Sequence, residues 1–193
     1  MKDKKIIVLM GGPSAEREVS LNTGKGIAKA LRSKGYQVTE VDFEPRRFAD
    51  QLKESGAEVV FIALHGRFGE DGAVQGFLDI CGIPYTGSSA RTSSVAMDKY
   101  LSKEIFEAFH IPTPAAVLLR KSESSEHHRE QAMSLKYPLI VKPVAQGSSI
   151  GVCKVESEET LEKNLAEVFK YGETALLEAF IPGREFTVAV LVD

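Results

Sequence analysis

The sequence of 193 residues has no long hydrophobic run, no basic cluster and only two cysteines. Its longest apolar stretches, such as residues 59–64, have the length of a strand and are far too short to span a bilayer. We therefore expect no membrane contact. A net charge of −3 without a basic run disfavours a nucleic-acid backbone as the main partner. Cys81 and Cys153 lie far apart without metal-site spacing, and we predict that both are reduced and structural.

Several familiar sequence signals are also missing. No apolar signal-peptide region follows residues 1–5, which predicts a cytoplasmic protein. The P-loop pattern Gly-x-x-x-x-Gly-Lys-Ser/Thr is absent. Residues 11–20 do not contain the Gly-x-Gly-x-x-Gly fingerprint of dinucleotide-binding folds, so a dinucleotide-dependent oxidoreductase is disfavoured. With 43% hydrophobic and 26% charged residues, the composition is that of an ordinary globular protein of one large or two small domains.

The N-terminal part alternates strand-like and helix-like segments. The predicted order is strand, helix, strand, helix, strand, at residues 5–10, about 16–34, 36–42, 47–55 and 58–64. The glycines at 35 and 56 end the two helices. The inner face of the first helix should hold Ile27, Ala28, Ala30 and Leu31. This order predicts a doubly wound α/β domain with a parallel sheet, in which ligands bind at the carboxyl ends of the strands.

Two loops follow strands at that predicted edge. In the first loop, Glu16 could receive a substrate ammonium, although Glu16 and Glu18 could also simply complement the helix dipole. The second loop, residues 65–72, contains three glycines and begins with His65. Glycines at that density suit a loop that passes close to a ligand. A lone histidine is more often structural, but His65 directly follows a buried strand at the ligand edge.

A domain boundary is predicted at residues 110–114, which contain two prolines. Before it, we expect a helix from 73 to 78, a short strand within 82–89 and one helix from about 92 to 109. That last helix carries Lys99 and Lys103, and we expect Lys103 on a solvated face. After the boundary, the predicted elements form a small α+β module. Its strands are expected at 115–119, 139–141, 152–155, 175–181 and 185–192, and its helices at 122–135 and about 157–171.

The chain is organised around residues 138–152. A short buried strand delivers Lys142, and a loop of glycines and hydroxyls follows at residues 147–151 before an extended pattern resumes. Glycines allow backbone N–H groups to turn toward an anion, and Ser148 and Ser149 add further donors. This pattern indicates a hairpin flap over phosphates. The plain alternative is a glycine turn beside a surface lysine.

A third candidate feature lies near the end of the sequence. Backbone groups of an unpaired strand edge can recognise adenine, an aromatic or aliphatic neighbour can cover its face, and a carboxylate can bind ribose hydroxyls. The residues that could do so are Glu178, Phe180, Ile181 and Glu185. The alternative is a strand with two solvated glutamates.

Together these motifs resemble those of the D-alanine–D-alanine ligases, which belong to the ATP-grasp enzymes. The matching segments are residues 11–21, 64–72, 85–88 with 97–99, and 141–143 with 147–152. The resemblance extends over the whole sequence. It implies an N-terminal α/β domain at 1–98, a central ATP-grasp subdomain at 99–181 and the start of a truncated third domain at 182–193.

The resemblance also implies roles for individual residues. Glu16 would bind the ammonium of the first D-alanine, with Val19 and His65 nearby and Ser148 in the same hydrogen-bond network. The ATP contacts would come from Lys99, Lys142, Ser148, Ser149, Glu178, Phe180, Ile181 and Glu185. The magnesium ligands would lie beyond Asp193, so no metal ligand is assigned within the sequence and the 193 residues alone are expected to be inactive.

The activity implied is ATP-dependent joining of two D-alanines through a D-alanyl phosphate, for peptidoglycan precursor synthesis. The resemblance further implies a homodimer through the N-terminal domain. Two alternatives stay open. The second substrate could be D-lactate or D-serine, or the chain could be a non-catalytic module that binds a nucleotide or an amino acid.

Overall fold

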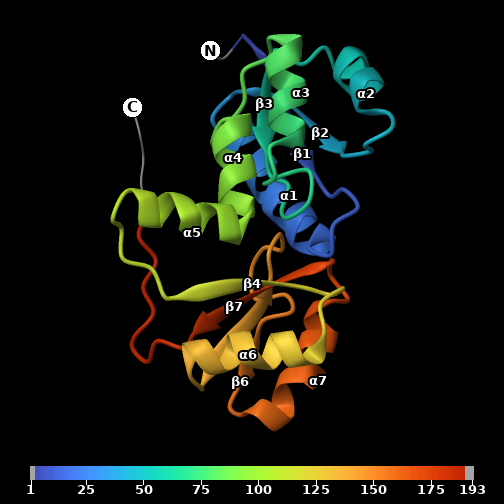
Figure 1. Cartoon of the computed structure of the whole chain (residues 1–193). Coiled ribbons are helices and arrows are strands. Elements are labelled where there is room, and N and C mark those ends of the chain that lie inside the picture. The colour runs from blue at the N-terminus through green and yellow to red at the C-terminus, as the bar shows by residue number, and fades with distance from the viewer. Residues whose placement is uncertain (1–2, 190–193) are drawn as a thin grey trace. The chain divides into compact units, whose positions relative to one another are not determined.

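The computed structural model describes residues 3–189, and that part of the chain contains seven helices and two sheets (Figure 1). The chain divides into two compact units. The first contains the residues up to Ile105 together with Ala145–Ser148, and the second contains Phe106–Val144 and the residues from Ser149 onward. None of the helices among residues 3–189 is long and apolar enough to cross a membrane.

The first unit is built on a parallel sheet with the strand order β2-β1-β3. Its strands are β1 (Lys5–Met10), β2 (Gln37–Asp42) and β3 (Val59–Ile62), and the connecting helices are α1 (Arg17–Ser33) and α2 (Phe48–Ser55). Alternate residues of β1 point to opposite faces. Ile7 and Leu9 join one apolar cluster, whereas Val8 and Met10 join another that includes Ala28 of α1. The predicted doubly wound α/β fold is confirmed.

Helix α1 packs on the sheet through a narrow face. Ala28 is buried, and Ile27 and Leu31 are partly buried against it. Ala30 is exposed, so its predicted place on the inner face is wrong. The reason is geometric, because two residues span about 200° of a helix and place Ala30 nearly opposite Ala28. Gly35 follows the helix with φ of +82°, as predicted for a helix-ending glycine.

Three further helices complete the first unit and its edge: α3 (Ala73–Cys81), α4 (Ala90–Met97) and α5 (Lys99–Ala108). The single helix predicted from 92 to 109 is wrong, because Asp98 adopts an extended conformation between α4 and α5. Its Oδ1 atom accepts a hydrogen bond from the Leu101 N–H (2.9 Å) and so begins a new helix. Lys103 is only 6% exposed, which contradicts the expected solvated face.

The second unit contains an antiparallel sheet with the order β4-β7-β5-β6. Its elements are β4 (Ala116–Arg120), α6 (Ser125–Leu135), β5 (Leu139–Pro143), β6 (Cys153–Val155), α7 (Glu158–Val168) and β7 (Thr174–Ala179). Residues of α6, α7 and the strands form one apolar core, which includes Ala132, Leu161 and Leu177. The α+β module and the β5–β6 hairpin are therefore confirmed.

The last predicted strand is not found where the structure describes the chain. Residues 185–189 have no regular secondary structure, and residues 190–192 lie outside the described range. A strand requires a hydrogen-bonded neighbour. None of the strands within residues 3–189 pairs with this segment.

Candidate functional site

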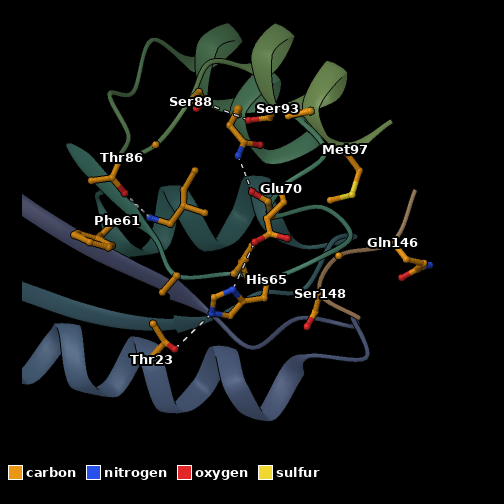
Figure 2. Close-up of a pocket in the computed structure, with 18 of the residues that line it drawn as sticks. Thr23, Phe61, His65, Glu70, Thr86, Ser88, Ser93, Met97, Gln146 and Ser148 are labelled. Atoms are coloured by element: carbon orange, nitrogen blue, oxygen red, sulfur yellow. Dashed lines mark hydrogen bonds and ion pairs between the residues drawn. The ribbon is translucent and has the colours of Figure 1, made fainter. Parts of the chain in front are cut away.

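A cavity of about 690 Å³ opens in the first unit beside β3 and α1 (Figure 2). Its lining comes from α1, from β3 and the loop after it, from residues 86–88, from α4, and from the loop at 146–148. His65, Lys99 and Ser148 all lie on its wall. The structure therefore brings three of the predicted site residues to one cavity.

The loop before α1 is fixed to the end of β2. The Arg17 guanidinium forms two hydrogen bonds to the Asp42 carboxylate, at 2.7 and 2.5 Å. Asp42 Oδ1 also accepts a bond from the Gly12 N–H at 3.3 Å. The hydrogen bond from Arg17 is the main reason why the pKa of Asp42 lies below its ordinary value. Glu16 therefore precedes a helix whose first residue is anchored to the sheet.

Ser20 joins the start of α1 to the sheet from inside the protein. Its buried Oγ accepts a hydrogen bond from the Gly11 N–H (2.8 Å) and donates one to the Ala63 carbonyl (2.7 Å). Gly11 follows β1 and Ala63 follows β3. One hydroxyl thus links the ends of two strands to the helix, at the edge where ligands bind in parallel sheets.

The Glu16 carboxylate lies between two loops. A Cβ atom built on Gly66 would be 3.1 Å from Glu16 Oε2, and one built on Gly147 would be 3.3 Å from it. Glu16 makes no side-chain capping bond to α1. Although the helix dipole favours a carboxylate at this position, its side chain faces the glycine loops next to the cavity. Val19 is 54% exposed and does not line the cavity.

His65 is held between two polar side chains, as Figure 2 shows. Its Nε2 atom lies 3.5 Å from Thr23 Oγ1, and its Nδ1 atom lies 3.6 Å from Glu70 Oε1. Glu70 Oε2 accepts a hydrogen bond from the Gly66 N–H at 2.9 Å. The sequence reasoning missed Glu70. Its position in the same glycine-rich loop as His65 was the available signal.

The 145–148 loop closes the cavity wall in the first unit. The Lys99 ammonium donates a hydrogen bond to the Gln146 carbonyl. A Cβ on Gly147 would be 3.3 Å from Glu70 Oε2 as well as from Glu16 Oε2. Ser148 has a φ of +55°, which is unusual for a residue other than glycine. The loop thus brings its backbone at Gly147 close to the carboxylates of Glu16 and Glu70, and Lys99 of α5 binds its carbonyl at Gln146.

The other predicted nucleotide residues lie in the second unit. Lys142 on β5 forms an ion pair with Glu178 on the adjacent strand β7. Glu178 is 8% exposed, so the alternative of a solvated glutamate is wrong at this position. The Lys154 ammonium lies 4.5 Å from the centre of the Phe180 ring. Ile181 is exposed, and Glu185 is exposed in the segment without regular structure.

The hairpin that carries Ser149 depends on one glycine. Gly151 has a φ of +69°, and a Cβ there would approach Pro143 to 2.8 Å and Tyr171 to 2.9 Å. Both the conformation and the contact require glycine. No group of three or more His, Cys, Asp or Glu side chains among residues 3–189 is arranged to hold a metal ion.

Two family models match the sequence. Residues 44–88 match the model described as the D-ala D-ala ligase N-terminus, and residues 105–193 match the D-ala D-ala ligase C-terminus. Among curated relatives, the D-alanine--D-alanine ligase of Syntrophotalea carbinolica is 49% identical over 191 residues, which are 99% of this chain and 61% of the relative. That of Desulforudis audaxviator is 48% identical over 189 residues, 97% of this chain and 61% of the relative. The chain spans about three fifths of the length of these relatives.

Solved structures of ligases from the same family are also similar to this chain. The D-alanine--D-alanine ligase of Bacillus anthracis has a TM-score of 0.85 at 36% identity, with 93% of this chain and 58% of that chain covered. The structure of that ligase complexed with ATP has a TM-score of 0.83 at 34% identity, covering 93% and 60%. The VanG D-Ala:D-Ser ligase of Enterococcus faecalis has a TM-score of 0.78 at 25% identity, covering 93% and 63%.

Proposed function

Because the chain belongs to the D-alanine–D-alanine ligase family, we propose that it supplies the N-terminal and central parts of an enzyme that joins two D-alanines at the expense of ATP. The observation that carries this proposal is the cavity of the first unit, which His65, Lys99 and Ser148 line together, with the Glu16 carboxylate close to Gly66 and to the lining residue Gly147. These groups suit a small zwitterion and a phosphorylated partner. The dipeptide would serve peptidoglycan precursor synthesis in the cytoplasm.

In the proposed site, Glu16 binds the ammonium of the first D-alanine. Its carboxylate lies close to Gly66 and Gly147, whose lack of a side chain allows Glu16 to approach both loops. His65, which lines the cavity, would lie beside the amino acid, and Val19 is proposed to lie near it although it does not line the cavity. The Ser148 hydroxyl would join Glu16 in orienting the amino acid. An ammonium beside a carboxylate in a partly buried site gains a charge-assisted hydrogen bond.

The nucleotide is proposed to bind through lysines, hydroxyls and the residues at the end of β7. The unpaired strand edge expected there from the sequence is wrong for Glu178, because β7 pairs with β4 on one side and with β5 on the other. Lys99 and Lys142 would neutralise the phosphates, and the hairpin with Ser148 and Ser149 would cover them. The adenine and ribose contacts would come from Glu178, Phe180, Ile181 and Glu185. Two contacts support the adenine and ribose assignment. The Lys154 ammonium lies over the Phe180 ring, and Glu178 is paired with Lys142.

The proposed reaction has two steps. A carboxylate oxygen of the first D-alanine attacks the γ-phosphorus of ATP, so that D-alanyl phosphate forms and ADP leaves. The amine of the second D-alanine then attacks the acyl carbon, loses a proton and expels inorganic phosphate as the amide bond forms. Positioning and neutralisation of negative charge would supply most of the catalysis. The hairpin at 147–151 would exclude water from the acyl phosphate.

Magnesium is part of this proposal, because phosphoryl transfer from ATP normally uses the ion to neutralise phosphate charge. The described residues 3–189 do not form a cluster that fits the ion. We propose that its ligands belong to the part of the family's length that this chain does not span.

We also propose the domain limits 1–98, 99–181 and 182–193, and a homodimer formed through the N-terminal domain. Light scattering on the purified protein would measure its mass directly. A mass of one chain at micromolar concentration would contradict the dimer. Limited proteolysis with mass spectrometry would locate the boundaries, which should be the first sites of cleavage.

The function can be tested with a chimera in which residues 1–193 replace the matching part of the Syntrophotalea carbinolica ligase. We expect D-alanine-dependent ADP release from the chimera and none from the 193-residue chain alone. A folded chimera that binds ATP and D-alanine but forms no dipeptide would contradict the proposal. ATP binding without turnover would instead favour a non-catalytic binding module.

The identity of the second substrate follows from the same assay. The D-Ala:D-Ser ligase among the solved structures makes D-serine a second candidate. The 49% identity to a D-alanine--D-alanine ligase favours the dipeptide. Supplying D-alanine with D-serine or D-lactate, and identifying the product by mass spectrometry, would decide between them.

A further inference from the structure

Gln75 is a buried polar residue on the otherwise largely apolar helix α3. It is 4% exposed and lines the cavity of the first unit. Its Nε2 atom donates a hydrogen bond of 2.6 Å to the carbonyl of Gly69, in the loop that carries His65. A side chain from a helix thus reaches into the backbone of the proposed substrate loop.

The bond from Gln75 fixes one peptide plane. The carbonyl of the Gly69–Glu70 peptide is held by Gln75, and its N–H donates to the Gly66 carbonyl at 2.9 Å. Gly69 also packs tightly, because a Cβ there would lie 2.4 Å from the Cβ of Leu64. A peptide plane held on both sides sets the direction in which the next side chain leaves the backbone.

That next side chain is Glu70. Its carboxylate accepts the Gly66 N–H at 2.9 Å and lies 3.6 Å from the His65 imidazole. It also faces the 145–148 loop, since a Cβ on Gly147 would be 3.3 Å from Glu70 Oε2. Any rotation of the Gly69–Glu70 peptide would therefore move the carboxylate that orients His65.

The other end of the Gln75 amide argues against a role in stability alone. Its Oε1 atom is buried and has no hydrogen-bond partner among the residues that the structure describes. A buried acceptor without a partner destabilises the folded state. An apolar side chain of similar length would avoid this cost, so the glutamine is best explained by its donor.

We propose that Gln75 is a positioning residue, which holds the Gly69–Glu70 peptide and through Glu70 orients His65 toward the amino-acid substrate. This inference rests on the proposed function for the identity of the ligand. The hydrogen-bond chain from Gln75 to Glu70 stands without it.

The test uses the 193-residue chain and the variant Gln75→Met, which keeps the length of the side chain and removes the donor. We would measure the solvent-exchange rate of the Glu70 amide by NMR and the affinity for D-alanine by titration. The control is Gln51→Met, because Gln51 also donates from a helix to a backbone carbonyl, that of Asp42 at 2.7 Å, but does not line the cavity.

In Gln75→Met, we expect the Glu70 amide to exchange about tenfold faster and D-alanine to bind about tenfold more weakly, whereas Gln51→Met should change neither. Unchanged exchange at Glu70 would overturn the proposal, and so would faster exchange with unchanged affinity. If neither the unmodified chain nor the chimera binds D-alanine, the proposed function fails, while the exchange rate still tests the positioning.

A second variant tests the donor itself. In Gln75→Glu, the introduced carboxyl cannot donate to Gly69 when it is ionised, but its protonated form can. Burial raises the pKa of a carboxyl, so the pH series extends above neutral pH. We expect weak D-alanine binding where the carboxyl is ionised and recovery relative to the wild type as the pH is lowered. If Gln75 only stabilised the fold, the affinity for D-alanine would not recover at low pH unless the thermal stability of the variant recovered with it. Binding equal to the wild type at every pH from acid to alkaline would contradict the proposal.

Discussion

At the scale of single residues, Asp42 connects the end of β2 to the loop before α1. It pairs with Arg17 and accepts the Gly12 N–H. Both side chains of the pair are nearly half exposed, so solvent screens their attraction. The pair therefore contributes modest stability, but it fixes the residue that follows Glu16.

The first prediction concerns the pH dependence of this pair. Because the pKa of Asp42 is lowered in the folded protein, its contribution is present above the unfolded pKa of about 3.9 and is lost as the pH falls through the folded value. We expect Asp42→Asn to lower the free energy of unfolding at pH 7 by about 0.5–1 kcal/mol, after allowance for screening. The difference from the wild type should shrink below about pH 4. Urea denaturation at several pH values measures it, and a difference that stays constant down to pH 2 would contradict the assignment.

At the scale of elements, α1 contains two glycines with opposite surroundings. A Cβ on Gly24 would lie 2.6 Å from the Cβ of Met10 and 2.8 Å from its sulfur. A Cβ on Gly26 would meet no atom within 4 Å. Gly24 thus allows the helix to approach β1 closely, whereas Gly26 only weakens the helix.

This pair of glycines gives the second prediction. Gly24→Ala should lower the free energy of unfolding by about 1–3 kcal/mol, because overpacking outweighs the gain in helix propensity. Gly26→Ala should raise it by about 1 kcal/mol, because alanine is the better helix former. Chemical denaturation of both variants measures the contrast. Equal effects of the two substitutions would show that the close approach of α1 to β1 does not determine the outcome.

The elements also show how far sequence reasoning reaches. The strands and helices of the first unit follow from apolar runs and from Gly35 and Gly56, which are local signals. The break at Asp98 has a local cause too, but apolar spacing on both sides of it resembles one helix. Because α5 is a separate helix after the break, the spacing of apolar residues in α4 does not predict which side of α5 is buried. The burial of Lys103 was missed for that reason.

For the candidate site, the sequence predicts the glycine loops and the lysines, but it does not predict the side-chain contacts that connect them. The spacing of His65 and Glu70 does not reveal that the imidazole Nδ1 lies 3.6 Å from the carboxylate. The Gln75 side chain, in the first turn of α3, donates to the carbonyl of Gly69 in the loop before the helix. Such contacts depend on the direction of side chains in the folded unit, which no sequence period specifies.

At the scale of the whole molecule, the proposed chemistry requires two different ligands and assigns them to different residues. Glu16 lies in the first unit, where it should bind an ammonium, and Lys142 lies in the second unit, where it should bind phosphate. Removing one charge should therefore affect mainly one substrate. This separation distinguishes a two-substrate ligase from a module that binds a single ligand.

The third prediction compares Glu16→Gln with Lys142→Ala in the catalytic chimera. Lys142→Ala should raise the KM for ATP by about tenfold or more and lower kcat, because a phosphate charge loses its partner. Glu16→Gln should raise the KM for D-alanine by about tenfold and leave the KM for ATP unchanged. Lys170→Ala, an exposed lysine that follows α7, serves as the control for loss of a positive charge.

Since Lys142 also pairs with the buried Glu178, the thermal stability of Lys142→Ala must be measured alongside its kinetics. A folded variant with unchanged KM for ATP and unchanged kcat would show that the phosphate assignment is wrong. A folded Glu16→Gln variant that affects ATP rather than D-alanine would reverse the assignment of the two ligands. If Lys142→Ala loses activity toward both substrates only because the protein unfolds, the pair of Lys142 and Glu178 acts on stability. Breaking a buried ion pair leaves a charge without its former partner.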